Sequence, residues 1–289
     1  NNKRKNINTD IATPLSHKFN EYEFFLGVGD STKVYSQIGV NFRNTDSIQN
    51  NKFERINNSK TYYIKSKLIH SKTANLNTYI NYRKVDNLNF KNVESLNSKI
   101  VYTQQLFNQF LSFSSVYQTL SGNLPQQDYT YIKTEPGQGF YTWIDYNNNG
   151  IKELNEFEIA QFPDQATYLR IILPTVNYIA THQNKFTQTL SINPQQWNSK
   201  TGFKKLFSHF YNQTYILVDS KQRKIDNTFN LNPFDVNNED LIGLNFNFNN
   251  SFYFNKGEKN YSTTYNFIKS QNKNTTTIDN LENKIQIHK

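Results

Sequence analysis

The 289-residue sequence contains no cysteine and no methionine. Without cysteine, the chain has no disulfide framework, no zinc–thiolate centre and no catalytic thiol. The lack of cysteine is also compatible with an exported protein. Because the first residues, NNKRKN, contain neither a start residue nor a signal peptide, we expect the chain to be a piece of a longer protein whose targeting signals have been removed.

Long apolar runs are absent as well. No stretch approaches the roughly 20 apolar residues that a membrane-spanning helix needs. Hydrophobic residues make up only 36% of the chain, with 10 Gly and 7 Pro, but aromatic residues reach 15%, including 23 Phe and 19 Tyr. Disordered chains are poor in aromatic residues, so we expect a folded chain.

The net charge of +9 permits contact with polyanions. The 32 Lys and Arg are scattered, however, and the clusters at 3–5 and 221–224 are interpreted as solvated surface. A dedicated nucleic-acid site would gather these charges on one face or along one element. No nucleic-acid partner is therefore predicted.

Alternation of apolar and polar residues with period two is the main signal in the sequence. It is strongest in 242–254 and is repeated in 74–82. Polar turns at 70–73 and 255–260 separate neighbouring runs, as expected for antiparallel hairpins, and the longer polar stretches 44–60 and 219–240 are expected to be loops. Further strands are predicted at 34–42, 62–68, 99–107, 110–119, 129–133, 169–173, 186–192, 214–218, 261–267 and 284–288.

The charged residues avoid the apolar face of the best alternating runs. Lys65, Lys67, Arg83 and Arg170 are all predicted to lie on the opposite face. A membrane strand needs about 9–11 residues with alternate positions facing lipid, and a charge near the midplane of that face costs about 2–4 kcal/mol. Tyrosines near strand ends suit the interfacial girdles of a membrane barrel; they are Tyr62, Tyr82, Tyr129, Tyr131 and Tyr261.

These patterns predict an all-β chain, an antiparallel up-and-down meander that forms a transmembrane β-barrel or a sector of one. A soluble antiparallel sandwich alternates in the same way, so periodicity alone leaves that alternative open. The length of the 242–254 run favours the membrane, because ordinary strands have about 5–6 residues. The predicted division is an N-terminal segment (1–30), β-hairpins (31–133), a calcium-loop insertion (134–166) and further β-hairpins (167–289).

The insertion contains the one pattern that indicates binding chemistry. Residues 145–156 match D-x-[DN]-x-[DN]-G-x5-E, the pattern of a calcium loop, with Gly150 at the sharp turn. Calcium takes 6–8 oxygen ligands from loop positions 1, 3, 5, 7, 9 and 12. The predicted ligands of a structural Ca²⁺ are the side chains of Asp145, Asn147, Asn149, Glu153 and Glu156 and the main-chain carbonyl of Ile151.

The surroundings of this loop differ from those of a paired calcium hand. Position 8, usually aliphatic, is Lys152, so we expect an isolated structural ion rather than a sensor. Leu154, Phe157 and Gln161 have helical spacing, which predicts a short helix after the loop. The alternative is a solvated Asx-turn loop followed by an acidic helix start.

The same segment carries a resemblance. PGQGFYTWIDYNNNGIKELNEFEIAQFPDQATYLRI, followed by FTQTLSINP, resembles a stretch of large, mostly uncharacterised surface and outer-membrane proteins of Bacteroidota. The similarity covers residues 134–194, and the flanking hairpins resemble that group only in pattern. The resemblance implies an outer-membrane, β-rich protein of a Gram-negative cell, without a settled activity.

No motif indicates an enzyme. The chain has no P-loop, no GxGxxG and no GxSxG, and its His residues are too dispersed for a zinc site; they are His17, His70, His182, His209 and His288. Trp143 and Trp197 are interpreted as packing anchors rather than sugar-stacking residues. A hydrolase that uses carboxylates such as Asp145 or Glu158 is the weakest alternative.

The predicted function is therefore a component of the Gram-negative outer membrane. It would act in transport, surface assembly or envelope structure, with the calcium loop at one rim of the barrel. The predicted partners are outer-membrane lipid or lipopolysaccharide and other envelope proteins. The alternative is a soluble, secreted β-sandwich that binds a glycan or a protein partner.

Overall fold

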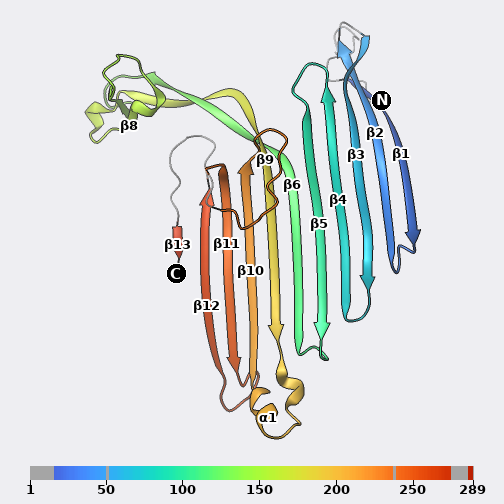
Figure 1. Ribbon diagram of the computed structural model, residues 1–289. Coiled ribbons are helices and arrows are strands. Elements are labelled where there is room, and N and C mark those ends of the chain that lie inside the picture. The colour runs from blue at the N-terminus through green and yellow to red at the C-terminus, as the bar shows by residue number, and fades with distance from the viewer. Residues whose placement is uncertain (1–15, 50–51, 237–238, 275–285, 289) are drawn as a thin grey trace. The chain divides into compact units, whose positions relative to one another are not determined.

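The computed structural model describes residues 16–49, 52–236, 239–274 and 286–288 (Figure 1). It is all-β, with 65% strand and 6% helix, and it confirms the predicted antiparallel meander. The strands are β1 (His17–Gly29), β2 (Tyr35–Gln49), β3 (Lys52–His70), β4 (Ala74–Asn87), β5 (Val93–Leu106), β6 (Leu111–Lys133), β7 (Tyr141–Trp143), β8 (Phe157–Ile159), β9 (Tyr168–Ile192), β10 (Phe210–Arg223), β11 (Leu241–Phe254), β12 (Thr263–Asn274) and β13 (Gln286–His288). The short helices are η1 (Leu154–Glu156), η2 (Pro163–Gln165), η3 (Pro194–Trp197) and α1 (Phe203–Phe207).

The long strands lie in one sheet in the order β1-β2-β3-β4-β5-β6-β9-β10-β11-β12-β13 (Figure 1). Apart from β6 and β9, which β7 and β8 separate in the sequence, each strand of this order is followed along the chain by its neighbour in the sheet, which gives an antiparallel meander. The sheet is not closed into a barrel. Of the two predicted forms, a closed barrel or a sector of one, the described residues form an open sheet.

The chain divides into two compact units. The sheet unit contains the described residues of 16–122 and 180–274, together with 286–288. The loop unit contains 123–179, and the predicted insertion at 134–166 lies within it. Strands β6 and β9 each contribute residues to both units, and β7 and β8 belong to the loop unit.

The predicted N-terminal segment contains a strand that the alternation pattern did not indicate. β1 pairs with β2 along its whole length, from His17 opposite Ser47 to Gly29 opposite Tyr35. The adjacent pair Phe24 and Phe25 interrupts the period of two, because one of the two rings must lie on each face. The first fifteen residues of the chain, including the basic cluster at 3–5, lie outside the described residues.

The polar stretch 44–60, expected to be a loop, is also mostly strand. β2 continues to Gln49 and β3 begins at Lys52, so the two strands extend well beyond the apolar part of the sheet. Arg55 holds this extension together, since its Nε donates to Asp46 Oδ1 at 2.6 Å and its Nη1 to Asn58 Oδ1 at 2.8 Å. Backbone pairing with polar side chains on both faces gives a strand without apolar alternation.

The prediction of a short helix after the calcium loop is wrong. A single 3₁₀ turn, η1, is followed directly by β8, which pairs with β7 through Trp143 opposite Phe157 and Tyr141 opposite Ile159. The pairing with β7 uses the backbone groups that a helix would have needed. Two short strands therefore flank the loop.

Candidate functional site

One face of the sheet unit carries an apolar surface over β1–β4. The register places Leu26, Ile38, Ile64 and Ile80 side by side in one row across the four strands. The next row along the strands contains Phe24, Val40, Tyr62 and Tyr82. Because alternate residues of a strand share a face, both rows lie on the same side. We call this surface the apolar face.

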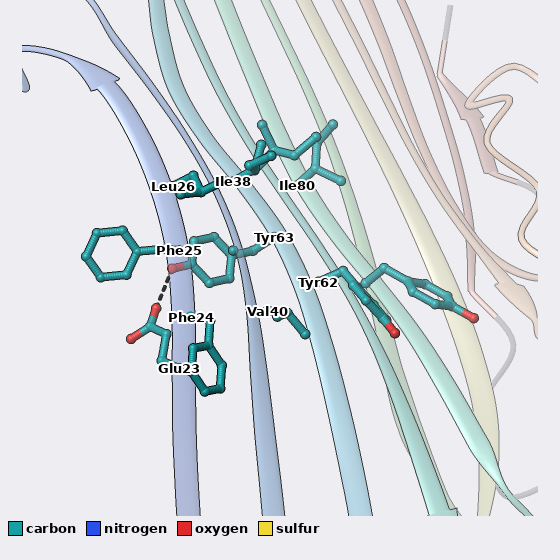
Figure 2. Close-up of a pocket in the computed structure, with 12 residues that line it drawn as sticks. Glu23, Phe24, Phe25, Leu26, Ile38, Val40, Tyr62, Tyr63 and Ile80 are labelled. Atoms are coloured by element: carbon teal, nitrogen blue, oxygen red, sulfur yellow. Dashed lines mark hydrogen bonds between the residues drawn. The ribbon is translucent and has the colours of Figure 1, made fainter.

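The apolar face is open over β1–β3, whereas on β4 the ring of Tyr82 meets Phe229 edge-on at 6.3 Å. Leu26 is 76% exposed, Phe24 64% and Ile38 53%, values that are high for large apolar side chains in a sheet. A hollow of about 920 Å³ borders these strands; Figure 2 shows that its lining combines apolar-face residues such as Leu26 and Ile38 with Glu23 and Tyr63 of the opposite face. No second sheet lies over this face in the part of the chain that the structure describes. Exposed contiguous apolar surface of this kind marks contact with a membrane or another molecule.

A change from apolar to aromatic and then to charged side chains marks one end of the apolar face. Tyr62 and Tyr82 are direct cross-strand partners, and their rings stack with centroids 6.5 Å apart. Two residues further along, Lys60 on β3 lies opposite Lys84 on β4, and Lys84 Nζ lies 3.9 Å from Glu94 Oε1 on β5. Tyrosine followed by lysine is the order expected where hydrocarbon gives way to the polar interface of a bilayer.

The opposite face of the same strands is polar. Tyr63 is buried there, and its hydroxyl donates to Glu23 on β1 (Figure 2). The same hydroxyl accepts from Gln37 Nε2 at 3.1 Å. Gly39 lies directly opposite Tyr63, and a Cβ at this glycine would overlap the tyrosine ring. Lys65, Lys67 and Arg83 lie on this face, as predicted.

The apolar face is covered where it continues over β9–β11. Residues 224–236, which we call the strap, follow β10 and fold back over the sheet. Val218, 1% exposed, packs with Leu241 and Leu244 beneath the strap residue Val236, and Phe186 contacts the strap residue Phe234. Part of the predicted Phe and Leu ladder of 242–254 therefore packs against the chain itself.

Polar side chains fix the strap to the sheet. Asn184, fully buried on β9, donates from Nδ2 to the Asn230 carbonyl at 2.6 Å. The Tyr117 hydroxyl of β6 donates to the Leu231 carbonyl at 2.6 Å. These bonds satisfy strap carbonyls that would otherwise lie unpaired against an apolar surface. The sequence predicts only a polar loop here; the two Phe residues of the strap, each in contact with a ring of the sheet, are the feature that could have indicated its packing.

The predicted calcium loop in the loop unit is stabilised by its own side chains. Asp145 accepts from the backbone N–H of Asn149 at 3.1 Å and of Gly150 at 2.8 Å, one bond on each carboxylate oxygen. Gly150 has φ +71°, the left-handed conformation that the sharp turn requires. Asn147 Oδ1 accepts from Asn149 N–H at 3.0 Å, and Asn149 Oδ1 accepts from Ile151 N–H at 2.7 Å. The turn expected at position 6 is present.

The two glutamates of the loop differ in environment. Glu153 is half-buried, and its carboxylate accepts from Asn147 Nδ2 at 3.2 Å on Oε2 and from Asn149 Nδ2 at 3.4 Å on Oε1. Glu156 is 1% exposed, and its Oε2 accepts from Trp143 Nε1 at 2.9 Å and from the Glu153 N–H at 3.3 Å. Glu156 Oε1 is buried and has no hydrogen-bond partner. A buried, half-satisfied carboxylate is costly unless a cation or another donor completes it.

The carboxylates of the loop do not form a metal cluster by themselves. Within the described residues, no three His, Cys, Asp or Glu side chains lie close enough together to hold a metal ion. An ion bound here would depend on the amide oxygens of Asn147 and Asn149 and on the Ile151 carbonyl as well. Glu158, one of the carboxylates considered for hydrolysis, accepts from the Tyr146 hydroxyl at 2.5 Å, and this bond raises the pKa of the Tyr146 phenol.

Aromatic side chains pack next to the loop and support it. Phe157 stacks on Tyr131 with centroids 4.0 Å apart and meets Tyr168 edge-on at 5.0 Å. Trp143 donates to Glu156, and Trp197 stacks on Phe110 at 4.7 Å in the sheet unit. Both tryptophans are therefore packing anchors, as predicted. The hydrogen bond from the half-buried Trp143 holds the carboxylate of Glu156, the last predicted ligand, in place.

Comparisons of the chain with models of known protein families, with curated proteins and with solved structures found no match. Among the described residues, no helix has the length and apolar content needed to cross a bilayer. The functional assignment therefore depends on the two features above, the apolar face of β1–β4 and the loop at 145–156.

Proposed function

We propose that the sheet unit is a wall segment of a β-structure embedded in the Gram-negative outer membrane. The apolar face of β1–β4 would contact lipid, and the polar face with Tyr63, Lys65 and Arg83 would face water. The single observation that carries this proposal is the open, charge-free apolar face, bordered in register by tyrosines and then lysines. In a membrane, such a border lies at the interface with the headgroups.

The dimensions of β4 fit this role. From Ala74, next to the hairpin turn, to Tyr82, before Lys84, β4 presents nine residues whose apolar-face positions carry no charge. Nine residues at about 3.3 Å each extend about 30 Å, and a tilt of about 45° reduces this to about 21 Å of membrane depth. That depth approaches the roughly 25 Å apolar band of outer-membrane barrels.

A membrane-embedded sheet also needs partners for its edges. Backbone groups in hydrocarbon must be hydrogen-bonded, and an open edge leaves a row of them unpaired. β1 pairs only with β2 among the described residues. The proposal therefore requires further strands along β1, and it describes the sheet as a sector of a larger structure.

The alternative is a soluble, secreted β-domain that binds a glycan or a protein partner. The strap supports this alternative, because a chain segment that covers apolar side chains is what a soluble sheet needs. Cell fractionation distinguishes the two. A wall segment remains in the outer-membrane fraction after carbonate washing and is released by detergent. Recovery in the soluble fraction without detergent would contradict the membrane role and support the secreted domain.

We also infer that residues 145–156 bind a structural Ca²⁺. The observation that favours this role is Glu156, whose buried Oε1 has no partner in a segment with the ligand pattern of a calcium loop. Calcium would supply the partner that Glu156 Oε1 lacks and would order the loop, since an ion that binds only the folded form adds to its stability. Glu156 and Asp145 would be the main acidic ligands, with the Asn147 and Asn149 amide oxygens completing the set.

Terbium luminescence tests the calcium site, because Trp143 contacts Glu156 and lies within energy-transfer range of a lanthanide bound there. We expect sensitised emission that calcium displaces, and loss of emission in Asp145→Asn and Glu156→Gln. Glu135→Gln, an exposed carboxylate outside the loop, is the matched control and should leave emission unchanged. EDTA should raise protease nicking within 134–166. No sensitised emission, together with equal cleavage with and without EDTA, would refute calcium binding.

A further inference from the structure

Lys60 and Lys84 form a cationic pair at the border of the apolar face. They are direct partners in the antiparallel register of β3 and β4, so their side chains project from the same face. Lys60 is exposed, and its ammonium makes no ion pair or hydrogen bond with the described residues. Lys84 has one carboxylate nearby, Glu94, at 3.9 Å. Asp86 also lies on this face, two residues beyond Lys84. Among the described residues neither Asp86 nor Glu94 forms an ion pair with Lys60, so the Lys60 ammonium lies uncompensated next to an apolar surface.

Like charges directly opposite each other on neighbouring strands repel, so the pair is unfavourable without a counter-charge. Two residues away, about 6.6 Å along the strand, the stacked rings of Tyr62 and Tyr82 begin the apolar face. An anion that bridges the lysines would thus lie within a few ångströms of the hollow lined by Phe24, Val40 and Tyr62 (Figure 2). The arrangement suits a molecule with an anionic head and a hydrocarbon tail.

We propose that this site binds the phosphate group of an anionic membrane lipid, with an acyl chain lying along the apolar hollow. This inference rests on the proposed membrane role and identifies the lipid class that the face prefers. Charge complementarity favours an anionic lipid over a zwitterionic one, because Lys60 has no internal counter-ion. Lysine binds phosphate as a point charge, so the contact does not require one fixed geometry.

The test compares vesicles of phosphatidylcholine with vesicles of an equal mixture of phosphatidylcholine and phosphatidylglycerol. The refolded chain is floated with each, and the ratio of bound protein gives its preference for anionic lipid. A basic side chain near an anionic surface contributes about fivefold to binding, so Lys60→Gln should reduce the preference about fivefold. The preference should also fall as salt is raised, because salt screens exposed charges.

Lys99→Gln is the matched control. Lys99 is exposed on β5, and the register places it on the polar face, opposite Tyr79. The substitution Lys99→Gln removes the same charge as Lys60→Gln from a chain of net charge +9 and leaves the border of the apolar face unchanged. A loss of preference in Lys60→Gln but not in Lys99→Gln supports the lipid site.

Equal losses in the two variants, or equal binding of the unmodified chain to both vesicles, would overturn the inference and leave the membrane role standing. Failure of the unmodified chain to insert into either kind of vesicle would overturn both proposals. A variant that does not fold is recognised from its β-sheet circular dichroism. In that case Lys60→Met and Lys99→Met, which remove the charge but keep an unbranched apolar stem, are compared in the same way, and equal losses again overturn the inference.

Discussion

Replacement of Ile38 by lysine separates lipid contact from water contact most sharply. Ile38 lies in the middle of the apolar face, between Leu26 on β1 and Ile64 on β3, and is 53% exposed. If hydrocarbon surrounds this side chain, a lysine there costs about 2–4 kcal/mol. If water surrounds it, the cost stays below about 1 kcal/mol, because the lysine stem keeps part of the apolar contact and the ammonium remains hydrated.

The matched control is Asn41→Lys on the polar face of the same strand. Asn41 is the register partner of Glu23, and its Nδ2 donates to Glu21 Oε1 at 2.6 Å. A lysine at this position meets two carboxylates, so its free energy of unfolding should change by less than about 1 kcal/mol. The two variants add the same charge to the same strand and differ only in the face that carries it.

Urea unfolding from phosphatidylcholine vesicles, followed by the fluorescence of the two tryptophans, gives both free energies of unfolding. We expect Ile38→Lys to be less stable than Asn41→Lys by about 2 kcal/mol or more. A difference below about 0.5 kcal/mol, the usual range of surface substitutions, would refute lipid contact at Ile38.

Two further predictions concern packing and are also measured by urea unfolding. Gly39→Ala should lower the free energy of unfolding by about 1–3 kcal/mol, because its Cβ would displace the Tyr63 ring from its hydrogen bonds. Gly27→Ala is the control, because a Cβ there meets only ordinary contacts, and it should lower this free energy by less. Equal losses in the two variants would contradict this explanation. Val218→Ala should lower the free energy of unfolding by about 2 kcal/mol, because Val218 is 1% exposed beneath the strap. Val28→Ala, at a position that is 74% exposed, should lower it clearly less. An unchanged free energy of unfolding in Val218→Ala would mean that the strap does not cover this side chain.

The alternation of side chains made most of the sheet predictable. In β4 and β11 the apolar residues occupy every second position, and this pattern directly identifies a strand and its faces. Turn chemistry at 70–73 and 255–260 then predicted which strands are neighbours. The rows Leu26–Ile38 and Phe24–Val40 form because the hairpin turn pairs residues of equal parity.

The parts that were not predicted depend on contacts distant in sequence. The sequence pattern did not predict β1, because the Phe24–Phe25 pair breaks the alternation; backbone pairing with β2 makes this segment a strand. The helical spacing of Leu154 and Phe157 was equally compatible with the observed strand, and the pairing of Phe157 with Trp143 decided between them. The strap depends on the buried Asn184 and on the contact of Phe234 with Phe186, which no local pattern indicates.

For the loop, the residue types and the turn were predictable from the sequence, whereas the environment of each carboxylate depends on the fold. Gly150 has the predicted left-handed conformation, and Asp145 accepts backbone N–H groups as a first loop residue should. The burial of Glu156 depends on Trp143, which lies thirteen residues earlier. Spacing alone could not show that one oxygen of Glu156 would lack a partner.

Site-directed spin labelling along β2 tests lipid contact most directly. The chain contains no cysteine, so single cysteines at positions 37, 38, 40 and 41 can each carry a nitroxide without further changes. In vesicles, lipid contact predicts that labels at Ile38 and Val40 collide mainly with oxygen, which concentrates in hydrocarbon, and that labels at Gln37 and Asn41 collide mainly with a water-soluble nickel complex. Preferential collision with nickel at Ile38 and Val40 would contradict a lipid-facing sheet.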